Sequence, residues 1–321
     1  SRILDNSQGT MGLLALAGDK EILFSEKRDG FLMWRKWGSC VIELGDPEGA
    51  PDSLAELCWK FREIADETSK LCVFYGISSS MIPNVMDLGL RLFKIGEEGV
   101  VDLEGFSLSG SKTRGLRGGI NRVQRAGVTF RVMEMEEVRK RIGELRGVSD
   151  EWLAQKNTSE KCFSIGFFQE AYVSRFRCAV AERDGAIIGF TNIFESKVRH
   201  ELSVDLMRYR SDVPNGVMDF LFVKLFEWGK VNGYKTFSLG MAPLAGLPKN
   251  PLAPYYAKLA NVVYRQGGHF YNFDGLRKYK EKFHPLWQPR YLACPSGLYL
   301  PIVLSNVSTL ISGGVKGLIR K

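Results

Sequence analysis

The chain contains few of the side chains from which metal sites and histidine triads are built. It has three histidines in 321 residues, and none of them stands at metal-ligand spacing from another. Its six cysteines form no CxxC pair and lie mostly in apolar runs, which favours reduced thiols in a core over disulfides or a structural zinc. These absences argue against a metal hydrolase and a histidine-based triad, and we expect no metal and no cofactor.

A long hydrophobic run is missing too. No segment approaches the roughly 20 uninterrupted apolar residues of a membrane helix, and no signal peptide opens the chain, so we expect no membrane crossing. Acidic residues are in deficit, because 44 lysines and arginines face 36 aspartates and glutamates, a net charge of +8. That excess indicates an anionic partner such as nucleic acid or an acidic lipid surface. The alternative is a merely solubilising surface.

What is present suits two globular domains. The chain has 45% hydrophobic and 25% charged residues, and its length fits two domains of roughly 150 residues each. We expect a first domain over residues 1–130 and a second over 131–321 that ends in a helix. The start at SRILDNSQ, without a methionine, suggests a fragment of a larger protein.

The same order of elements is predicted once in each half of the chain. Hydrophobic periodicity predicts a strand, a Gly-bearing turn, an amphipathic helix and a second strand. The ranges are 40–45, 52–68 and 71–77 in the first half, and 203–207, 217–231 and 234–240 in the second. A further strand near 90–95 completes the unit of the first half. Such units bind anionic or carbonyl groups at the helix N-terminus, and they are the layout of GNAT-type acyltransferases. The predicted fold class is therefore α/β (α+β), with two tandem GNAT-like folds whose mixed sheets are flanked by helices.

The densest positive stretch lies between these units, from Gly105 to Met133. Its basic residues have no acidic neighbour in the stretch, and Leu116, Ile120 and Val123 give it one apolar face. The pattern predicts a helix packed on one side with its arginines outward. Because an ordinary solvated helix mixes both signs of charge, we interpret this surface as anion-binding. The candidate phosphate contacts are Lys112, Arg114, Arg117, Arg122 and Arg125.

Two segments near the C-terminus combine apolar with basic residues. Basic and aromatic residues alternate in RKYKEKFHPLWQPRY, over 277–291. This composition indicates a segment that binds phosphates together with planar or apolar parts of a ligand. The alternative is a packed loop whose lysines extend their charged ends to solvent. The tail from Leu298 has apolar residues at helical spacing, which predicts a docking helix, with a membrane-surface helix as the alternative.

Two charged residues, Asp205 and Arg208, stand in the predicted strand SVDLMR. Residues three apart on a regular strand point to opposite faces, so a bulge or a strand end must intervene if both reach one ligand. A structural ion pair is the alternative. Glu182, before the hairpin RDGA, could supply a second carboxylate facing Asp205, or could be a solvated charge at a strand end. Glu97 and Glu98 are interpreted as exposed, with a place in the cleft of the first repeat as the alternative.

Several longer strings resemble one known family. They run in the family's order from about Gly18 to Leu292, and they are SVDLMR, MDFLF, LGMAPL, YNFDGLRKYKEKFHPLWQPRYLA, GEEGVVDL, FSLSG and SDEWL. They resemble the catalytic domain of the phosphatidylglycerol lysyltransferases, the multiple peptide resistance factor family. The resemblance implies two GNAT-like folds at the cytoplasmic face of the bacterial inner membrane, normally joined to an N-terminal multi-pass membrane domain.

The resemblance also implies a reaction. Members move an aminoacyl group from aminoacyl-tRNA to a hydroxyl of phosphatidylglycerol, which weakens the negative charge of the membrane and blunts cationic antimicrobial peptides. Two polyanionic partners agree with the basic composition. Because one ester replaces another, the reaction needs neither ATP nor metal, and catalysis depends on positioning and charge stabilisation.

Catalytic roles are expected for Asp205, Arg208 and Lys280. Asp205 would hold the donor's ammonium, with Glu182 as a second aminoacyl-binding carboxylate, and Arg208 would hold a phosphate or the oxyanion. Lys280 would face the acceptor ester or the lipid phosphate, or act as base if burial lowers its pKa; an oxygen of the substrate is the other candidate base. The basic stretch would contact tRNA. The lipid-binding candidates are Arg277, Lys278 and Arg290.

Three alternatives stay open. They are a CoA-dependent GNAT acetyltransferase, a tRNA-dependent aminoacyltransferase acting on peptidoglycan precursors, and a non-catalytic tRNA- or lipid-binding module. Neither predicted turn has the arginine- and glycine-rich pattern that grips the CoA pyrophosphate, which disfavours the first. The second ammonium of lysine would need a further acid, which Glu182 could supply, so lysine is favoured over alanine as the transferred amino acid.

Overall fold

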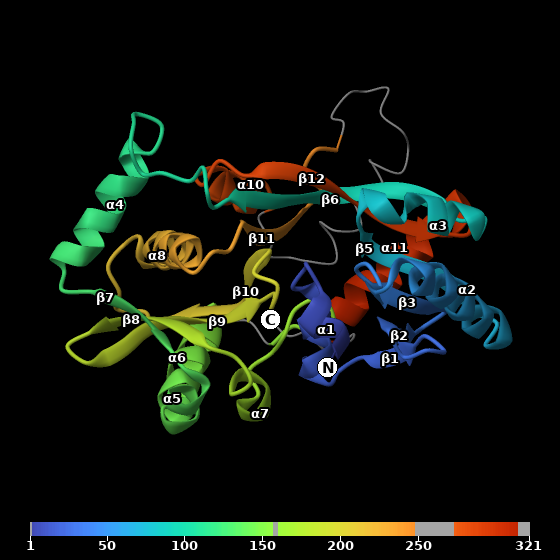
Figure 1. The fold of residues 1–321 in the computed structure, drawn as a ribbon, viewed down its shortest axis with the longest axis horizontal. Helices are drawn as coiled ribbons and strands as arrows, with labels where there is room; N and C mark the ends of the chain where they lie inside the picture. The colour runs from blue at the N-terminus through green and yellow to red at the C-terminus, as the bar shows by residue number, and fades with distance from the viewer. Residues whose placement is uncertain (1, 157–159, 248–272, 314–321) are drawn as a thin grey trace.

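A computed structural model describes residues 2–156, 160–247 and 273–313 (Figure 1). One twelve-stranded mixed sheet runs through these residues, in the order β1-β2-β3-β5-β12-β6-β11-β10-β9-β8-β7, with β4 paired to β2. The strands are β1 (Glu21–Phe24), β2 (Gly30–Trp37), β3 (Cys40–Leu44), β4 (Glu48–Gly49), β5 (Leu71–Ile77), β6 (Arg91–Asp102), β7 (Thr129–Met133), β8 (Cys178–Arg183), β9 (Ala186–Glu195), β10 (Glu201–Tyr209), β11 (Thr236–Pro243) and β12 (Leu286–Cys294).

Helices flank both faces of this sheet, so the predicted α/β class is confirmed. They are α1 (Arg2–Asn6), α2 (Pro51–Glu67), α3 (Ile82–Asp87), α4 (Arg114–Arg125), α5 (Met135–Lys140), α6 (Ile142–Gln155), α7 (Glu170–Val173), α8 (Val217–Val231), α10 (Phe273–Glu281) and α11 (Leu300–Ile311), with short 3-10 turns η1 (Met11–Ala17), η2 (Ser79–Met81) and η3 (Gly297–Tyr299). None of the helices in the described part of the chain is long and apolar enough to cross a membrane.

The predicted duplication of a strand–helix–strand unit is present. Strands β3 and β5 are parallel neighbours joined through α2, and β10 and β11 are parallel neighbours joined through α8. Proline at the first position of α2 and buried Leu57, Phe61 and Ala65 on one of its faces explain why that helix starts and packs as predicted. Helix α8 begins after Gly216, whose φ of 101° lies in the left-handed region that favours glycine.

Two segments join the halves in ways that periodicity did not predict. Strand β12, from the second half of the chain, lies between β5 and β6 of the first half. Helix α4 packs beside α8 of the second half, at the edge of the molecule (Figure 1). The boundary at residue 130 therefore stays a prediction, because one continuous sheet runs through both proposed domains.

Three apolar cores fix the layers. One lies under α2 and α3, and a second surrounds α8, which lies between strands β8–β9 and helix α10 in Figure 1. The third runs through both halves and contains residues of α6, α7, η1 and α11. Helix α6 thus covers the face of β9 and β10 opposite α8.

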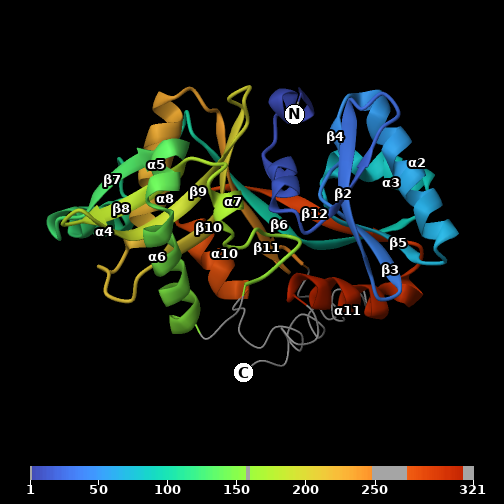
Figure 2. The same cartoon turned by 90° about the horizontal axis from the view of Figure 1, so that it is seen from below.

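The C-terminal helix is a docking helix. Its residues Leu300, Val303, Leu304, Val307 and Leu310 are buried, and it packs against β2 and β3 (Figure 2). The core-packing interpretation is confirmed for 300–311. The end of the predicted tail lies outside the described residues. Most of the cysteines are also core residues, as expected, since five are buried and Cys162 is partly buried.

Two predicted ranges need correction. The basic stretch 105–133 is helical only over Arg114–Arg125, because Gly127 takes a left-handed φ of 76° and β7 follows it. The strand predicted near 90–95 is β6, which continues to Asp102 because it pairs along its length with both β12 and β11.

Candidate functional site

A bulge in β10 brings Asp205 and Arg208 to the same face of the sheet. The pairing with β9 steps from Val204↔Ile193 to Met207↔Thr191, so two residues of β10 oppose the single residue between them on β9. The extra residue shifts by one the alternation of side chains between the two faces of the sheet. Both charged side chains therefore face the core that contains α6 and α7. The irregularity that their spacing required is therefore present.

The carboxylate of Asp205 is enclosed by donors. The backbone N–H of Gly166 donates to one carboxylate oxygen at 2.7 Å, and the hydroxyl of Tyr172 donates to the other at 2.8 Å. A Cβ on Gly166 would overlap the Asp205 carboxylate and the Tyr172 ring, so only glycine allows this approach. Burial raises the pKa of Asp205, while these two donors and the nearby Lys20 act against the rise. The site thus holds a carboxylate at low solvent exposure.

An ion pair between Asp19 and Lys20 lies beside Asp205. The ammonium of Lys20 is 2.5 Å from Asp19, and its side chain is fully buried. Burial lowers the pKa of Lys20, and the negative charges of Asp19 and Asp205 oppose that effect. The N–H of Phe163 donates to the second oxygen of Asp19 at 2.6 Å. The segment around residues 163–166 therefore binds both carboxylates through its backbone.

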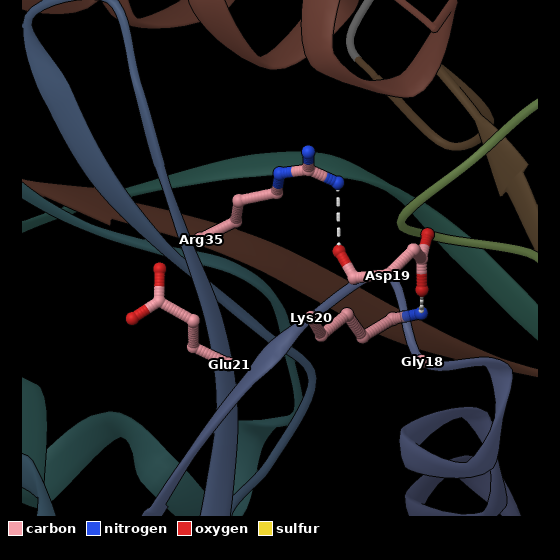
Figure 3. Close-up of a pocket in the computed structure, with 5 residues that line it drawn as sticks. All are labelled: Gly18, Asp19, Lys20, Glu21 and Arg35. Carbon is pink, nitrogen blue, oxygen red and sulfur yellow. Dashed lines mark hydrogen bonds and ion pairs between the residues drawn. The ribbon is translucent and has the colours of Figure 1, made fainter.

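An open cavity of about 250 Å³ adjoins this ion pair, lined by Gly18, Asp19, Lys20, Glu21 and Arg35. Figure 3 shows Lys20 and Arg35 directed toward Asp19, while the Glu21 carboxylate points away from the Arg35 guanidinium. Arg35 donates to the backbone carbonyl of Asp19 at 2.7 Å. The cavity therefore borders the buried Asp19–Lys20 pair, next to the partly buried Asp205.

Arg208 is buried and held by two neighbours. Its relative exposure is 5%, its Nη2 is 2.7 Å from Oε2 of Glu160, and its guanidinium carbon lies 4.3 Å from the centroid of the Trp152 ring. Arg208 thus forms its ion pair with Glu160 instead of Asp205, so the predicted alternative of an Asp205–Arg208 pair is wrong. Its Nη1 is buried without a hydrogen-bond acceptor.

Strands β10 and β11 separate beyond Ser203 and Ser238, where their parallel pairing ends. Lys280 of α10 reaches this point and donates to the carbonyls of Gly240 and Met241 at 2.9 and 3.0 Å. The lysine is 7% exposed, and burial lowers its pKa to about 8, against an opposing influence of Glu98. This pKa permits a neutral amine near physiological pH.

Buried polar groups fill the base of the separation. Glu201 accepts hydrogen bonds from the backbone and hydroxyl of Thr10 at 2.9 and 2.7 Å, and burial raises its pKa to about 7. Glu98 accepts from the hydroxyl of Ser238 and from Arg290, whose Nε lies 2.8 Å away. The interpretation of Glu97 and Glu98 as exposed is wrong, because their side chains are 14% and 13% exposed and bind cations.

The three predicted lipid-binding residues differ in their surroundings. Arg277 pairs with Glu97 and stacks on Trp287, its guanidinium carbon 4.5 Å from the ring centroid. Arg290 is bound by Glu98, whereas Lys278 is exposed. The two arginines therefore have carboxylate partners inside the protein, and Lys278 alone of the three points its charge to solvent.

The basic helix α4 presents its charges outward as predicted. Leu116, Ile120 and Val123 are buried against α8. Arg117 donates to the carbonyls of Leu108 and Gly110. Within the described ranges none of the remaining four cations has a carboxylate within salt-bridge distance. These four are Lys112, Arg114, Arg122 and Arg125.

Glu182 does not face Asp205, so that expectation is wrong. It lies two strands away, on β8, at the level of Ile187 of β9, whereas the bulge lies opposite Asn192. Arg131 binds it at 2.7 Å and Arg141 binds its other oxygen. These arginines lower its pKa. Glu182 is part of a local ion-pair network rather than of the Asp205 site.

Comparisons with known proteins identify the family of this chain. The family profile described as "Phosphatidylglycerol lysyltransferase, C-terminal" matches residues 1–294. The chain belongs to this family. The phosphatidylglycerol lysyltransferase of Bacillus subtilis (strain 168) is 36% identical over 304 residues, which cover 94% of this chain and 35% of that protein. That of Staphylococcus xylosus is 35% identical, over 90% of this chain and 34% of its own length. The chain spans about a third of the curated relatives it matches.

Solved structures of the phosphatidylglycerol lysyltransferase family have the same fold. A structure described as the C-terminal domain of a lysylphosphatidylglycerol synthetase from Agrobacterium fabrum has a TM-score of 0.89 and 39% identity, covering 98% of this chain and 96% of that one. L-PGS from Bacillus licheniformis has a TM-score of 0.86 and 39% identity, covering 95% and 93%. The resemblance stated from the sequence strings is confirmed.

Several neighbours of Asp205 in this lysyltransferase-family chain escaped sequence reasoning. Asp19 and Lys20 precede an ordinary short strand, and Gly166 and Tyr172 stand in an irregular segment without periodicity. Only the run of glycine and aromatic residues in FSIGFFQEAY, at 163–172, departs from a typical solvated loop. Their convergence depends on contacts across more than 30 residues of chain, which no local pattern contains.

Proposed function

We propose that this chain transfers an aminoacyl group, lysyl by preference, from aminoacyl-tRNA to a hydroxyl of phosphatidylglycerol. The observation that carries the proposal is the bulge in β10. It brings a carboxylate and a buried guanidinium with a free donor to one face of the sheet. The names of the relatives support lysyl transfer to this lipid.

The first requirement is to bind the cationic amino acid. In the proposal Asp205 binds the α-ammonium of the donor, because its carboxylate is already positioned by Gly166 and Tyr172. Asp19 lines the cavity, and its negative charge and that of Asp205 both act to raise the pKa of Lys20. It replaces Glu182 as the candidate for a second acid near the aminoacyl group.

The second requirement is to stabilise negative charge on the ester carbonyl. The lipid hydroxyl oxygen bonds to the carbonyl carbon, the bond to the tRNA ribose oxygen breaks, and the hydroxyl proton ends on that ribose oxygen. Arg208 supplies a cationic donor for the oxyanion between these steps. A neutral Lys280 can keep both of its donated hydrogen bonds and still accept the lipid proton through its lone pair.

The third requirement is to bind two polyanions. The unpaired cations Lys112, Arg114, Arg122 and Arg125 form the proposed tRNA surface, because each one that meets a phosphate releases counterions. Lys278 is the exposed candidate for the lipid phosphate, and Arg277 and Arg290 remain predicted contacts in its neighbourhood. An N-terminal membrane domain is the proposed partner in the whole protein, at the cytoplasmic membrane face where aminoacyl-tRNA is found. Masking anionic lipid would then reduce binding of cationic antimicrobial peptides.

The test uses the purified chain, radiolabelled lysyl- or alanyl-tRNA, and phosphatidylglycerol in detergent, with labelled lipid separated by chromatography. We expect labelled lipid from lysyl-tRNA, and losses of about 100-fold or more for Asp205→Ala and Arg208→Ala. Glu182→Gln is the matched control, because it removes a carboxylate outside the site. Wild-type rates in both site variants would refute the assignment. Activity with soluble muropeptide, or a rise in melting temperature with coenzyme A, would favour the two enzymatic alternatives.

A further inference from the structure

The guanidinium of Arg208 is fixed by two side chains from outside its own strand. The indole of Trp152, on α6, lies against the guanidinium, with 4.3 Å between its ring centroid and the guanidinium carbon. Glu160 accepts a hydrogen bond from Nη2 at 2.7 Å. The ring restricts the plane of the guanidinium and the carboxylate restricts its rotation within that plane, so together they leave little freedom to the group.

One donor of this fixed group has no acceptor. Nη1 of Arg208 is buried and makes no hydrogen bond, although the side chain is only 6% exposed. Buried polar atoms in folded proteins are nearly always hydrogen-bonded, and a cationic donor is the most costly to leave unpaired. A bound oxygen ligand would supply the acceptor. Asp205, the proposed ligand of the donor's ammonium, lies on the same face of the sheet as this guanidinium.

Helix α6 is attached to β10 independently of Trp152. Glu151 binds Arg210 at 2.8 Å and accepts from the backbone and hydroxyl of Ser211 at 2.7 and 2.6 Å. Lys156 lies over the ring of Tyr209 at 5.5 Å. A change at Trp152 should therefore release the guanidinium of Arg208 without detaching the helix.

We propose that Trp152 and Glu160 are positioning residues that hold Arg208 with Nη1 directed at the developing oxyanion of the aminoacyl ester. The inference rests on the proposed function, since it assigns the ligand oxygen to the transferred ester. An oxyanion forms only after the lipid hydroxyl attacks, so a misplaced guanidinium lowers kcat and leaves the KM for aminoacyl-tRNA nearly unchanged. If the ligand oxygen belonged to a ground-state phosphate, the change would appear in KM.

The kinetic test compares Trp152→Leu, Trp152→Phe and Glu160→Gln in the lysyl-tRNA assay. We expect Trp152→Leu to lower kcat by about 10- to 100-fold with KM within about 2-fold, by loss of an oriented oxyanion donor. Trp152→Phe keeps an aromatic face and should recover activity to within about 3-fold of wild type. Glu160→Gln keeps a hydrogen-bond acceptor but loses the negative charge, so its kcat should lie between those of Trp152→Leu and Trp152→Phe. The matched control is Trp59→Leu, because Trp59 is 50% exposed on α2.

Three kinetic results would overturn the inference. They are a Trp152→Leu enzyme with the kcat of Trp59→Leu, a loss confined to KM, and a Trp152→Phe enzyme no better than Trp152→Leu. A readout without turnover separates this inference from the proposed function. In chain labelled with ¹⁵N-arginine, the Arg208 side-chain signal, assigned with Arg208→Lys, should show slow guanidinium rotation that becomes faster in Trp152→Leu and Glu160→Gln.

The two readouts fail differently. If the wild-type chain forms no aminoacylated lipid, the proposed function and the oxyanion role fail together, while the NMR comparison still decides whether Trp152 and Glu160 hold Arg208. If the wild-type chain is active and the Arg208 signal is unchanged in both variants, the positioning role is wrong and the proposed function stands.

Discussion

Removing the hydroxyl of Tyr172 should change how activity depends on pH. The hydroxyl donates to Asp205 at 2.8 Å in a buried setting, and it favours the ionised carboxylate. Tyr172→Phe therefore raises the pKa of Asp205 beyond the elevation that burial already causes. Because the proposed function needs an ionised Asp205 to bind the donor ammonium, the acidic limb of kcat/KM should move to higher pH in the variant.

The size of the effect on stability follows from the same contact. A hydrogen bond to a charged group contributes about 1.5–3 kcal/mol, and one between neutral groups about 0.5–1.5 kcal/mol. An acid whose folded pKa is raised disfavours folding increasingly as pH rises from its unfolded value, 3.8 for Asp205, through its folded pKa. Tyr172→Phe should thus lower the free energy of unfolding by about 0.5–1.5 kcal/mol below that pH window and by about 1.5–3 kcal/mol above it. Urea unfolding measured across pH tests this.

A matched control exists elsewhere in the fold. Tyr234 donates to Glu195 at 2.7 Å and is 8% exposed, so Tyr234→Phe loses the same kind of hydrogen bond without removing a partner of Asp205. We expect Tyr234→Phe to lose stability but to keep the wild-type pH profile of activity. An acidic limb that stays in place in Tyr172→Phe, or that moves equally in both variants, would refute the role given to Asp205.

Further predictions concern groups around the site. Burial raises the pKa of Glu201 to about 7 from 4.5, so the wild-type free energy of unfolding should fall by roughly 3 kcal/mol as pH rises through that interval, and Glu201→Gln should abolish this fall in urea titrations. Glu182→Gln should destabilise the chain by only about 1 kcal/mol, because Arg131 keeps Glu137 and Arg141 keeps Glu144 as partners, and the rate of lipid labelling per folded molecule should stay near wild type. Changing Arg114, Arg122 and Arg125 together to glutamine should reduce the slope of log affinity for tRNA against log salt by about 2–3; an unchanged slope in filter binding would remove α4 from the tRNA surface.

The sequence alone determined the local elements and the family. Helices α2 and α8 and strands β3 and β5 follow from apolar periodicity and turn residues, because those signals act between near neighbours in the chain. The odd spacing of Asp205 and Arg208 also predicted a bulge or a strand end if both side chains were to reach one ligand, and the bulge is present in β10. The long matching strings then indicated the lysyltransferase family.

Tertiary structure decided which charged groups meet. Periodicity does not show that β12 enters the sheet between β5 and β6, so it gave no sign that Glu98 would face Arg290. It also placed Glu182 wrongly, because strand order, not strand content, sets which carboxylates become neighbours. Gly166 and Tyr172 reach Asp205, and Asp19 comes to lie near it, only through packing of distant segments. Burial is a property of that packing, and so are the raised pKa of Asp205 and the unfilled donor of Arg208.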